Sequence, residues 1–341
     1  MSPPRRRSIR LAAGIAAAIA LALAAARAHA NCGAEGCPFA PEGPEASRGR
    51  ISLDLGYQYI DQDRLWDGTH EISEADALLA EGGTGHVVEQ ETRTRAWLLN
   101  ARTQLTDRVL LTVTWPWIDR IHRHALEHHP GFFIPSEWHI QGPGDATVIL
   151  HWRALGGGDP NAVALSGQLG IKLPTGQRHV DEVNGEEPEP PVRPGNGSTD
   201  GVAGLQLRRP LRMHALDGSV AGVPLTLTLL GRVNGHGSEN YRSGNEWSLA
   251  LAGGYALSRW AHVIAQVNAA THGADSPGST DATAAHTGGT SVYASPGLRV
   301  EAAPGLVLYG YWQARVYQNT RGPQLVAPYH LSIGTSYAIG H

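Results

Sequence analysis

Hydrophobic and polar positions alternate along most of this chain, and residues 144–176 show the pattern most clearly. Two alternating runs lie on either side of the turn-rich sequence GGGDPN. A period of two residues is typical of β-strands that have one apolar and one polar face, so we predict a β-hairpin here. The apolar positions are Ala146, Val148, Leu150, Trp152 and Ala154 in the first run, and Val163, Leu165, Leu169, Ile171 and Leu173 in the second.

The same alternation recurs between Ile51 and Ile339. The runs are mostly of roughly 10 residues, the length of a tilted strand that crosses a lipid bilayer. The predicted strands cover residues 51–59, 97–105, 109–117, 146–154, 163–173, 201–207, 225–233, 247–257, 263–267, 292–300, 306–316 and 329–339.

The connections between these strands alternate in length. Those after the second, fourth, eighth and tenth strands are short, and the one after the sixth is intermediate. The others are longer and mostly polar. An even-stranded transmembrane barrel has this asymmetry, with short periplasmic turns and long external loops. We expect irregular structure in the long connections, among them residues 61–92, 119–143, 177–198 and 271–289.

The alternation alone also fits a soluble β-sandwich or a lipocalin-like barrel. Strands in those folds are usually shorter, about 5 or 6 residues. Beyond residue 30 the chain has no apolar run near the roughly 20 residues of a membrane-spanning helix, so a membrane role would require a β-barrel. We therefore predict an all-β protein, a transmembrane antiparallel β-barrel of about 12 strands with its apolar face against lipid.

The polar face of such a barrel would line a wet lumen. Charged side chains there can determine which solutes pass, or can form cross-strand ion pairs that only stabilise the barrel. Both interpretations stay open at this point. The lumen-lining candidates are Asp54, Arg102, Asp145, His151, Arg153, Lys172, Arg232, Arg299, Glu301 and Arg315.

Residues 1–30 have the pattern of a secretory signal peptide. A basic start with four arginines precedes an alanine- and leucine-rich run from Leu11 to Ala26. The small residues Ala28 and Ala30 then fit a cleavage site after Ala30. We expect the mature protein to be exported.

A short N-terminal segment, residues 31–48, is expected in the periplasm, and residues 49–341 are expected to form the barrel. The segment contains the only two cysteines of the chain, Cys32 and Cys37. A local disulfide is typical of an exported protein, whereas a metal site would need two further ligands from elsewhere. Both alternatives remain open.

Composition and motifs argue against catalysis and nucleic-acid binding. The net charge is −4, without the basic excess that a nucleic-acid partner requires. The chain contains neither a G-x-S-x-G nucleophile elbow nor an H-E-x-x-H zinc motif. We expect no enzymatic activity and no cofactor. An outer-membrane lipase or deacylase is the alternative, which an assay for ester hydrolysis would test.

Histidines and phenylalanines cluster in the predicted loop at 119–143. Imidazoles at this spacing can converge on Zn²⁺ or Cu²⁺, which makes them candidate metal ligands. The loop can equally be solvated, or it can form an apolar plug whose phenylalanines meet a hydrophobic substrate where it enters. The histidines are His122, His124, His128 and His129, and the phenylalanines are Phe132 and Phe133.

Several motifs, in order and spacing, resemble the outer-membrane β-barrel family of transporters assigned to the meta-pathway of phenol degradation. Together they span about residues 142–338. They are Gly142-x-Gly-Asp145, Gly170-Ile-Lys-Leu-Pro-Thr-Gly176, Gly197-Ser-Thr-Asp200, Ser295-Pro-Gly-Leu-Arg299 and the segment from Tyr317 to Val326.

The resemblance implies a channel in the outer membrane of a Gram-negative bacterium, through which small hydrophobic or aromatic compounds reach the periplasm. Its partners would be outer-membrane lipid, such solutes and the barrel-assembly machinery. That machinery typically reads a C-terminal aromatic residue, and because this chain ends in Gly-His, Tyr337 or Ile339 would have to serve. The alternative is a metal-associated or structural outer-membrane protein without transport activity.

Overall fold

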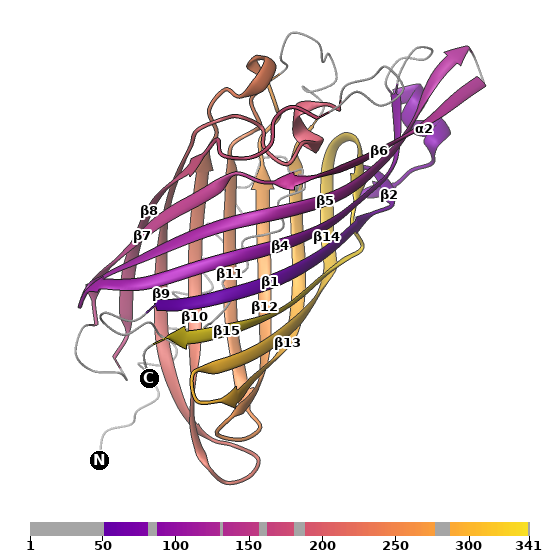
Figure 1. The fold of residues 1–341 in the computed structure, drawn as a ribbon. Coiled ribbons are helices and arrows are strands. Elements are labelled where there is room, and N and C mark those ends of the chain that lie inside the picture. Colours follow the sequence, from indigo (N-terminus) through magenta and orange to yellow (C-terminus); the bar gives the residue numbers. More distant parts are fainter. Residues whose placement is uncertain are drawn as a thin grey trace, which may run out of the picture.

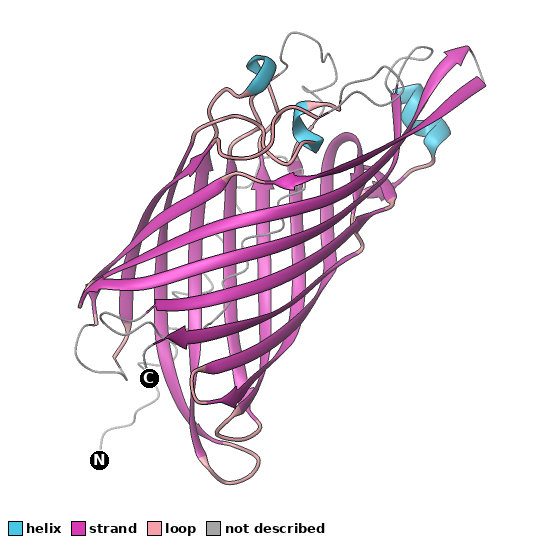
Figure 2. Ribbon diagram, in the orientation of Figure 1, coloured by secondary structure: helices cyan, strands magenta, loops and turns pink. Residues whose placement is uncertain are grey.

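The computed structural model describes residues 51–80, 87–129, 132–156, 162–180, 188–276 and 287–339. The predicted signal peptide and the segment with Cys32 and Cys37 lie outside these ranges. The described residues form one sheet of fifteen strands, twelve of which close into an antiparallel barrel (Figures 1 and 2). The predicted fold class, an all-β antiparallel barrel, is confirmed. No helix in the described ranges is long and apolar enough to cross a membrane.

Each barrel strand pairs with the next in sequence, and the last pairs with the first, where Ile51 faces Ile339. All twelve predicted strands coincide with barrel strands. In order these are β1 (Ile51–Gln62), β4 (Val87–Thr106), β5 (Val109–His129), β7 (Ala146–Leu155), β8 (Ala164–Leu173), β9 (Asp200–His214), β10 (Val220–Val233), β11 (Glu246–Ala256), β12 (Ala261–His272), β13 (Gly289–Ala303), β14 (Leu306–Val326) and β15 (Tyr329–Ile339).

The apolar face of the strands points out of the barrel and the polar face points in. On β1, Ile51 and Leu55 are each 46% exposed, whereas Ser52 and Asp54 between them are 1% and 2% exposed. Cross-strand partners keep this alternation around the sheet. The molecule is therefore apolar outside and polar inside, as expected for a barrel in lipid. We call these the outward and inward faces.

The two ends of the barrel differ. At one end, which we call the turn end, β4 joins β5 through Asp107 and Arg108, and β13 joins β14 through Pro304 and Gly305. The opposite loop end carries the longer connections, among them 174–199 and 234–245.

Short elements complete the loop end. The prediction of irregular structure between residues 61 and 92 is wrong in part, because this stretch contains two strands, a helix and the start of β4. The additional elements are β2 (Arg64–Gly68), β3 (His70–Glu71), α2 (Glu74–Ala80), β6 (Phe132–Pro143), and the 3-10 helices η1 (Pro190–Val192) and η2 (Ser238–Asn240).

The predicted loop at 119–143 is wrong, because β5 continues to His129 and pairs with β6. This hairpin projects beyond the barrel (Figure 1). The alternation persists there, but most outward positions become polar or charged. Trp97 faces Trp117 across the sheet, and at the next outward position Arg95 lies 3.5 Å from Asp119. The outward apolar belt therefore ends at the two tryptophans, and β5 beyond Trp117 lies outside it.

Candidate solute pathway

The inward face carries the residues predicted to line a lumen. They do not form a single site, because some lie near the loop end and others near the turn end. Strand register places Asp54 on the inward face of β1, Arg102 on β4, His151 and Arg153 on β7, Lys172 on β8, Arg232 on β10, Arg299 and Glu301 on β13, and Arg315 on β14, while Asp145 immediately precedes β7.

A buried ion cluster lies at the loop end. Lys172 Nζ lies 3.0 Å from Asp145 Oδ2 and 2.9 Å from Asp200 Oδ2, and it also donates to Asn196 Oδ1 and Ser198 Oγ. The three charged side chains are at most 3% exposed. We call these five residues the Lys172 cluster. Two carboxylates and one ammonium buried together are held by mutual pairing.

The Lys172 cluster also fixes three loop segments. Asp145 Oδ1 accepts a hydrogen bond from Gly176 N at 2.8 Å, and Asp200 Oδ1 accepts one from Gly235 N at 3.0 Å. The backbone of Gly176 lies directly against Gly144 and Gly195, where an added Cβ would be 2.8 Å from backbone atoms. Three of the motifs noted in the sequence thus meet in space. Their separate positions in the chain gave no sign of this contact.

Two arginines that the sequence analysis missed hold the loop before Asn196. Arg120 Nε donates to Thr94 Oγ1 at 3.0 Å, and its Nη1 donates to the carbonyl oxygen of Val192. Arg193 donates to Pro188 O and pairs with Glu239 at 2.7 Å. Recognising the alternation in 119–143 would have placed Arg120 on the inward face.

Val192 packs against Trp138 and Ile140 on the inward side of the β5–β6 hairpin. The rings of His122 and His124 join them, with His124 centred 4.3 Å from Trp138. His122 Nδ1 lies 2.7 Å from Thr92 Oγ1. The loop therefore closes over an aromatic cluster.

The metal and plug hypotheses for this region remain predictions. The described residues contain no group of three or more His, Cys, Asp or Glu side chains that could hold a metal ion. The side chains of His128, His129, Phe132 and Phe133 lie outside the described part of the structure, although their backbones belong to β5 and β6.

Acidification is expected to loosen this loop. Burial, together with His124 and Arg120, lowers the pKa of His122 to about 3. The pKa of this side chain in the unfolded protein is near 6.5. The contribution of the neutral, buried imidazole to folding stability is therefore complete above about pH 6.5, and it is lost as the pH falls toward the pKa of the folded protein. The protection of the Val192 and Arg193 amides against hydrogen exchange, corrected for the intrinsic exchange rate at each pH, should fall across this window. In the His122→Gln variant, the protection of these amides should depend less on pH. The same pH dependence in both proteins would contradict the role of His122.

A second polar network lies near the turn end. Asp54 Oδ1 accepts hydrogen bonds from Asn100 Nδ2 at 2.9 Å and from the Tyr309 hydroxyl at 3.1 Å. The hydroxyl end of the Tyr309 side chain lies against Gly334, where an added Cβ would lie 2.3 Å from the hydroxyl oxygen. His151 Nε2 lies 3.2 Å from a threonine hydroxyl on β5. Side chains from β1, β4 and β14 therefore form a continuous polar wall.

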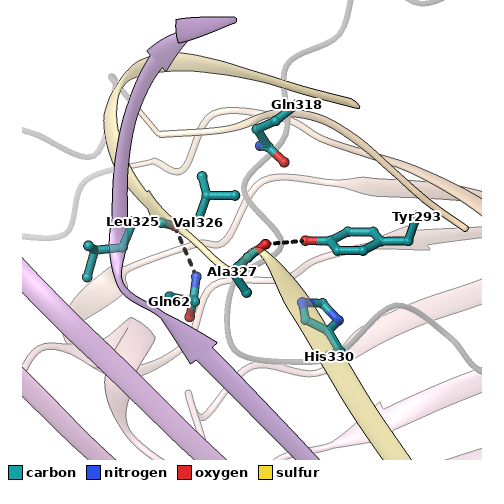
Figure 3. A pocket seen from close by; sticks show the side chains of 7 residues that line it. All are labelled: Gln62, Tyr293, Gln318, Leu325, Val326, Ala327 and His330. Atoms are coloured by element: carbon teal, nitrogen blue, oxygen red, sulfur yellow. Dashed lines mark hydrogen bonds between the residues drawn. The ribbon is translucent and has the colours of Figure 1, made fainter. Parts of the chain in front are cut away.

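A small pocket lies where β14 bends away from β15 toward β2 (Figure 3). Tyr293 donates to Ala327 O at 3.4 Å, and its ring lies 4.5 Å from that of His330. His330 Nδ1 is buried without a hydrogen-bond partner among the described residues. Nearby, Arg315 lies 4.3 Å above the Trp66 ring. The lining residues are Gln62, Tyr293, Gln318, Leu325, Val326, Ala327 and His330.

Comparison with solved structures shows which fold the chain shares. An outer membrane channel from Pseudomonas putida F1 is similar over 88% of this chain and 99% of that chain, with 14% identity and a TM-score of 0.56. A Pseudomonas aeruginosa FadL homologue is similar over 85% of this chain and 90% of that chain, with 11% identity and a TM-score of 0.44. The first similarity shows a common fold.

No protein-family model matches the chain, and no curated protein matches it. The fold implied by the motif resemblance is the fold observed. Membership of the phenol-pathway family remains a prediction.

Proposed function

We propose that the protein is an outer-membrane channel for the passive passage of small hydrophobic or aromatic compounds. The observation that carries this proposal is the arrangement of the faces, apolar outside and polar inside a closed barrel. A barrel of this kind is stable in lipid and encloses a path across it. The shared fold with a channel supports the role, and the motif resemblance supports the solute class.

In this proposal the turn end faces the periplasm and the loop end faces outward, as is usual for outer-membrane barrels. The exposed tryptophans Trp97 and Trp117 would then lie at the outer interface, where aromatic rings are favoured. Their position leaves the β5–β6 hairpin outside the bilayer. Solutes would pass the Lys172 cluster first and the Asp54 network last.

Narrowing the lumen should reduce transport. Thr147 on β7 faces inward, so Thr147→Trp would place an indole ring in the path. Intact Gram-negative cells that express the protein should take up the hydrophobic probe N-phenylnaphthylamine faster than cells without it. We expect the variant to lose about half or more of that added uptake, because pore width limits passage.

The neighbouring Val148→Trp is the matched control, because Val148 faces outward and its indole would meet lipid. Equal losses in both variants would contradict an inward path. Uptake no faster than in cells without the protein would refute the channel. The metal-associated alternative is tested on the purified protein in liposomes, with and without a chelator. It predicts that removing metal changes the stability of the protein and leaves solute flux unchanged.

A further inference from the structure

The charged side chains near the turn end of the inward face are mostly arginines. Arg102 and Arg299 each lie four residues before the end of their strand, and Arg153 lies two residues before the end of β7. Arg208 faces Ala164, the first residue of β8, across the sheet. All four are partly exposed. We call them the turn-end arginines.

Among the residues that the structure describes, two carboxylates share this part of the inward face. Asp54 is 2% exposed and engaged by Asn100 and Tyr309, whereas Glu301 is exposed at the end of β13. His151 and His262 add two imidazoles, which are neutral near neutral pH unless their pKa is raised. Four guanidinium groups against two carboxylates leave a positive sum, whatever the pairing among them.

The described residues at the rim of the turn end have the same sign. Three exposed arginines lie there, at Arg108, Arg212 and Arg259, and two exposed carboxylates, at Asp107 and Asp217. Salt screens exposed charges beyond about 8 Å, so the groups that line the path dominate the field that a solute meets.

Aromatic rings accompany the arginines. Arg299 faces Tyr309 directly across the β13–β14 pair, and the Tyr309 and Tyr311 rings are centred 6.1 Å apart. A guanidinium group recognises a carboxylate through two parallel hydrogen bonds, and a phenol ring offers an apolar face beside it. The combination suits a flat solute that carries an acid group.

We propose that the turn end of the lumen selects small organic anions, above all aromatic carboxylates. This inference rests on the proposed channel function and narrows its solute class. The positive field raises the local concentration of anions, and the guanidinium groups bind the carboxylate in passage.

Ion selectivity provides the first test. The protein is placed in planar bilayers under a gradient of potassium chloride, and the reversal potential gives the chloride-to-potassium permeability ratio. We expect chloride to be favoured by about threefold or more. The combined variant Arg153→Gln, Arg208→Gln and Arg299→Gln should bring the ratio to about one or below. Arg209→Gln is the matched control, because Arg209 lies beside Arg208 but on the outward face.

Equilibrium binding provides a second test that needs no conduction. Benzoate and benzyl alcohol have the same ring and differ in charge, and saturation-transfer NMR on the protein in detergent micelles compares their affinities. Benzoate should bind at least about threefold more tightly. The combined variant should lose this preference, while Arg209→Gln keeps it. Retained heat-modifiable mobility on gels confirms that each variant is folded.

The outcomes separate the two proposals. A conducting barrel with no anion preference, or a preference unchanged in the combined variant, would overturn the inference and leave the channel intact. A barrel that does not conduct would refute the channel. The binding test alone would then decide whether the turn end prefers anions. Preferential, arginine-dependent binding of benzoate supports the inference, and equal binding of the two probes overturns it.

Discussion

The Lys172→Ala variant is expected to lose about 3–5 kcal/mol of unfolding free energy. Lys172 Nζ lies within 3.0 Å of both Asp145 and Asp200, and the three side chains are almost fully buried. Removing the ammonium leaves two carboxylates buried without their cation. Each would have to take up a proton or draw in water. The loops held by these carboxylates should loosen at the same time.

Urea unfolding in lipid vesicles, followed by tryptophan fluorescence, would measure this loss. Arg95→Ala is the matched control, because Arg95 forms a more exposed ion pair with Asp119 at 3.5 Å. An exposed pair contributes at most about 1 kcal/mol. Adding Asp145→Asn and Asp200→Asn to Lys172→Ala should recover part of the stability. If Lys172→Ala costs no more than Arg95→Ala, the cluster is not what holds the loop end.

The Gly176→Ala variant is expected to cost about 1–3 kcal/mol. Its Cβ would lie 2.8 Å from Gly144 C and Gly195 Cα, and 2.9 Å from Asp145 N. These are backbone atoms, so no side-chain rotation can relieve the contact. The loops must move apart, which would also stretch the hydrogen bond from Gly176 N to Asp145.

Gly201→Ala is the control for this variant. Gly201 immediately follows Asp200 of the Lys172 cluster, but an added Cβ there meets no atom within 4 Å. Its unfolding free energy should stay within about 0.5 kcal/mol of the parent, the usual range for a surface substitution. The same urea titration compares the two alanines. Similar costs at both positions would mean that close backbone packing is not the reason for glycine at 176.

The twelve barrel strands could be predicted because most of their outward positions are apolar over the width of the belt. The β5–β6 hairpin could not, because its alternation continues with charged residues such as Asp119 and Arg123 on the outward face. Beyond the belt the outward face meets water and not lipid, so its side chains need not be apolar and the alternation of apolar and polar residues is lost. A strand in that setting resembles a polar loop unless its partner strand is known.

The candidate site shows a similar division. The residue types and faces of Asp145 and Lys172 followed from the alternation. Their pairing with Asp200 depends on how three loops cross, which no local pattern encodes. The pocket beside His330 depends on a bend in β14, and the adjacent Ala327-Pro328 connection gave no sign that the strand would leave its neighbour there.

The pairing of β1 with β15 has a consequence for the order of the strands. Ile51 and Ile339 lie opposite each other at the turn end, in the same antiparallel relation as any other neighbours. The wall is therefore a ring with no structural first strand. A short linker between these residues, with a new opening in another turn-end connection, would give a circular permutant with the same neighbours around the barrel. β1 is the first strand because of its place in the amino-acid sequence, and its pairing in the barrel is no different from that of any other strand.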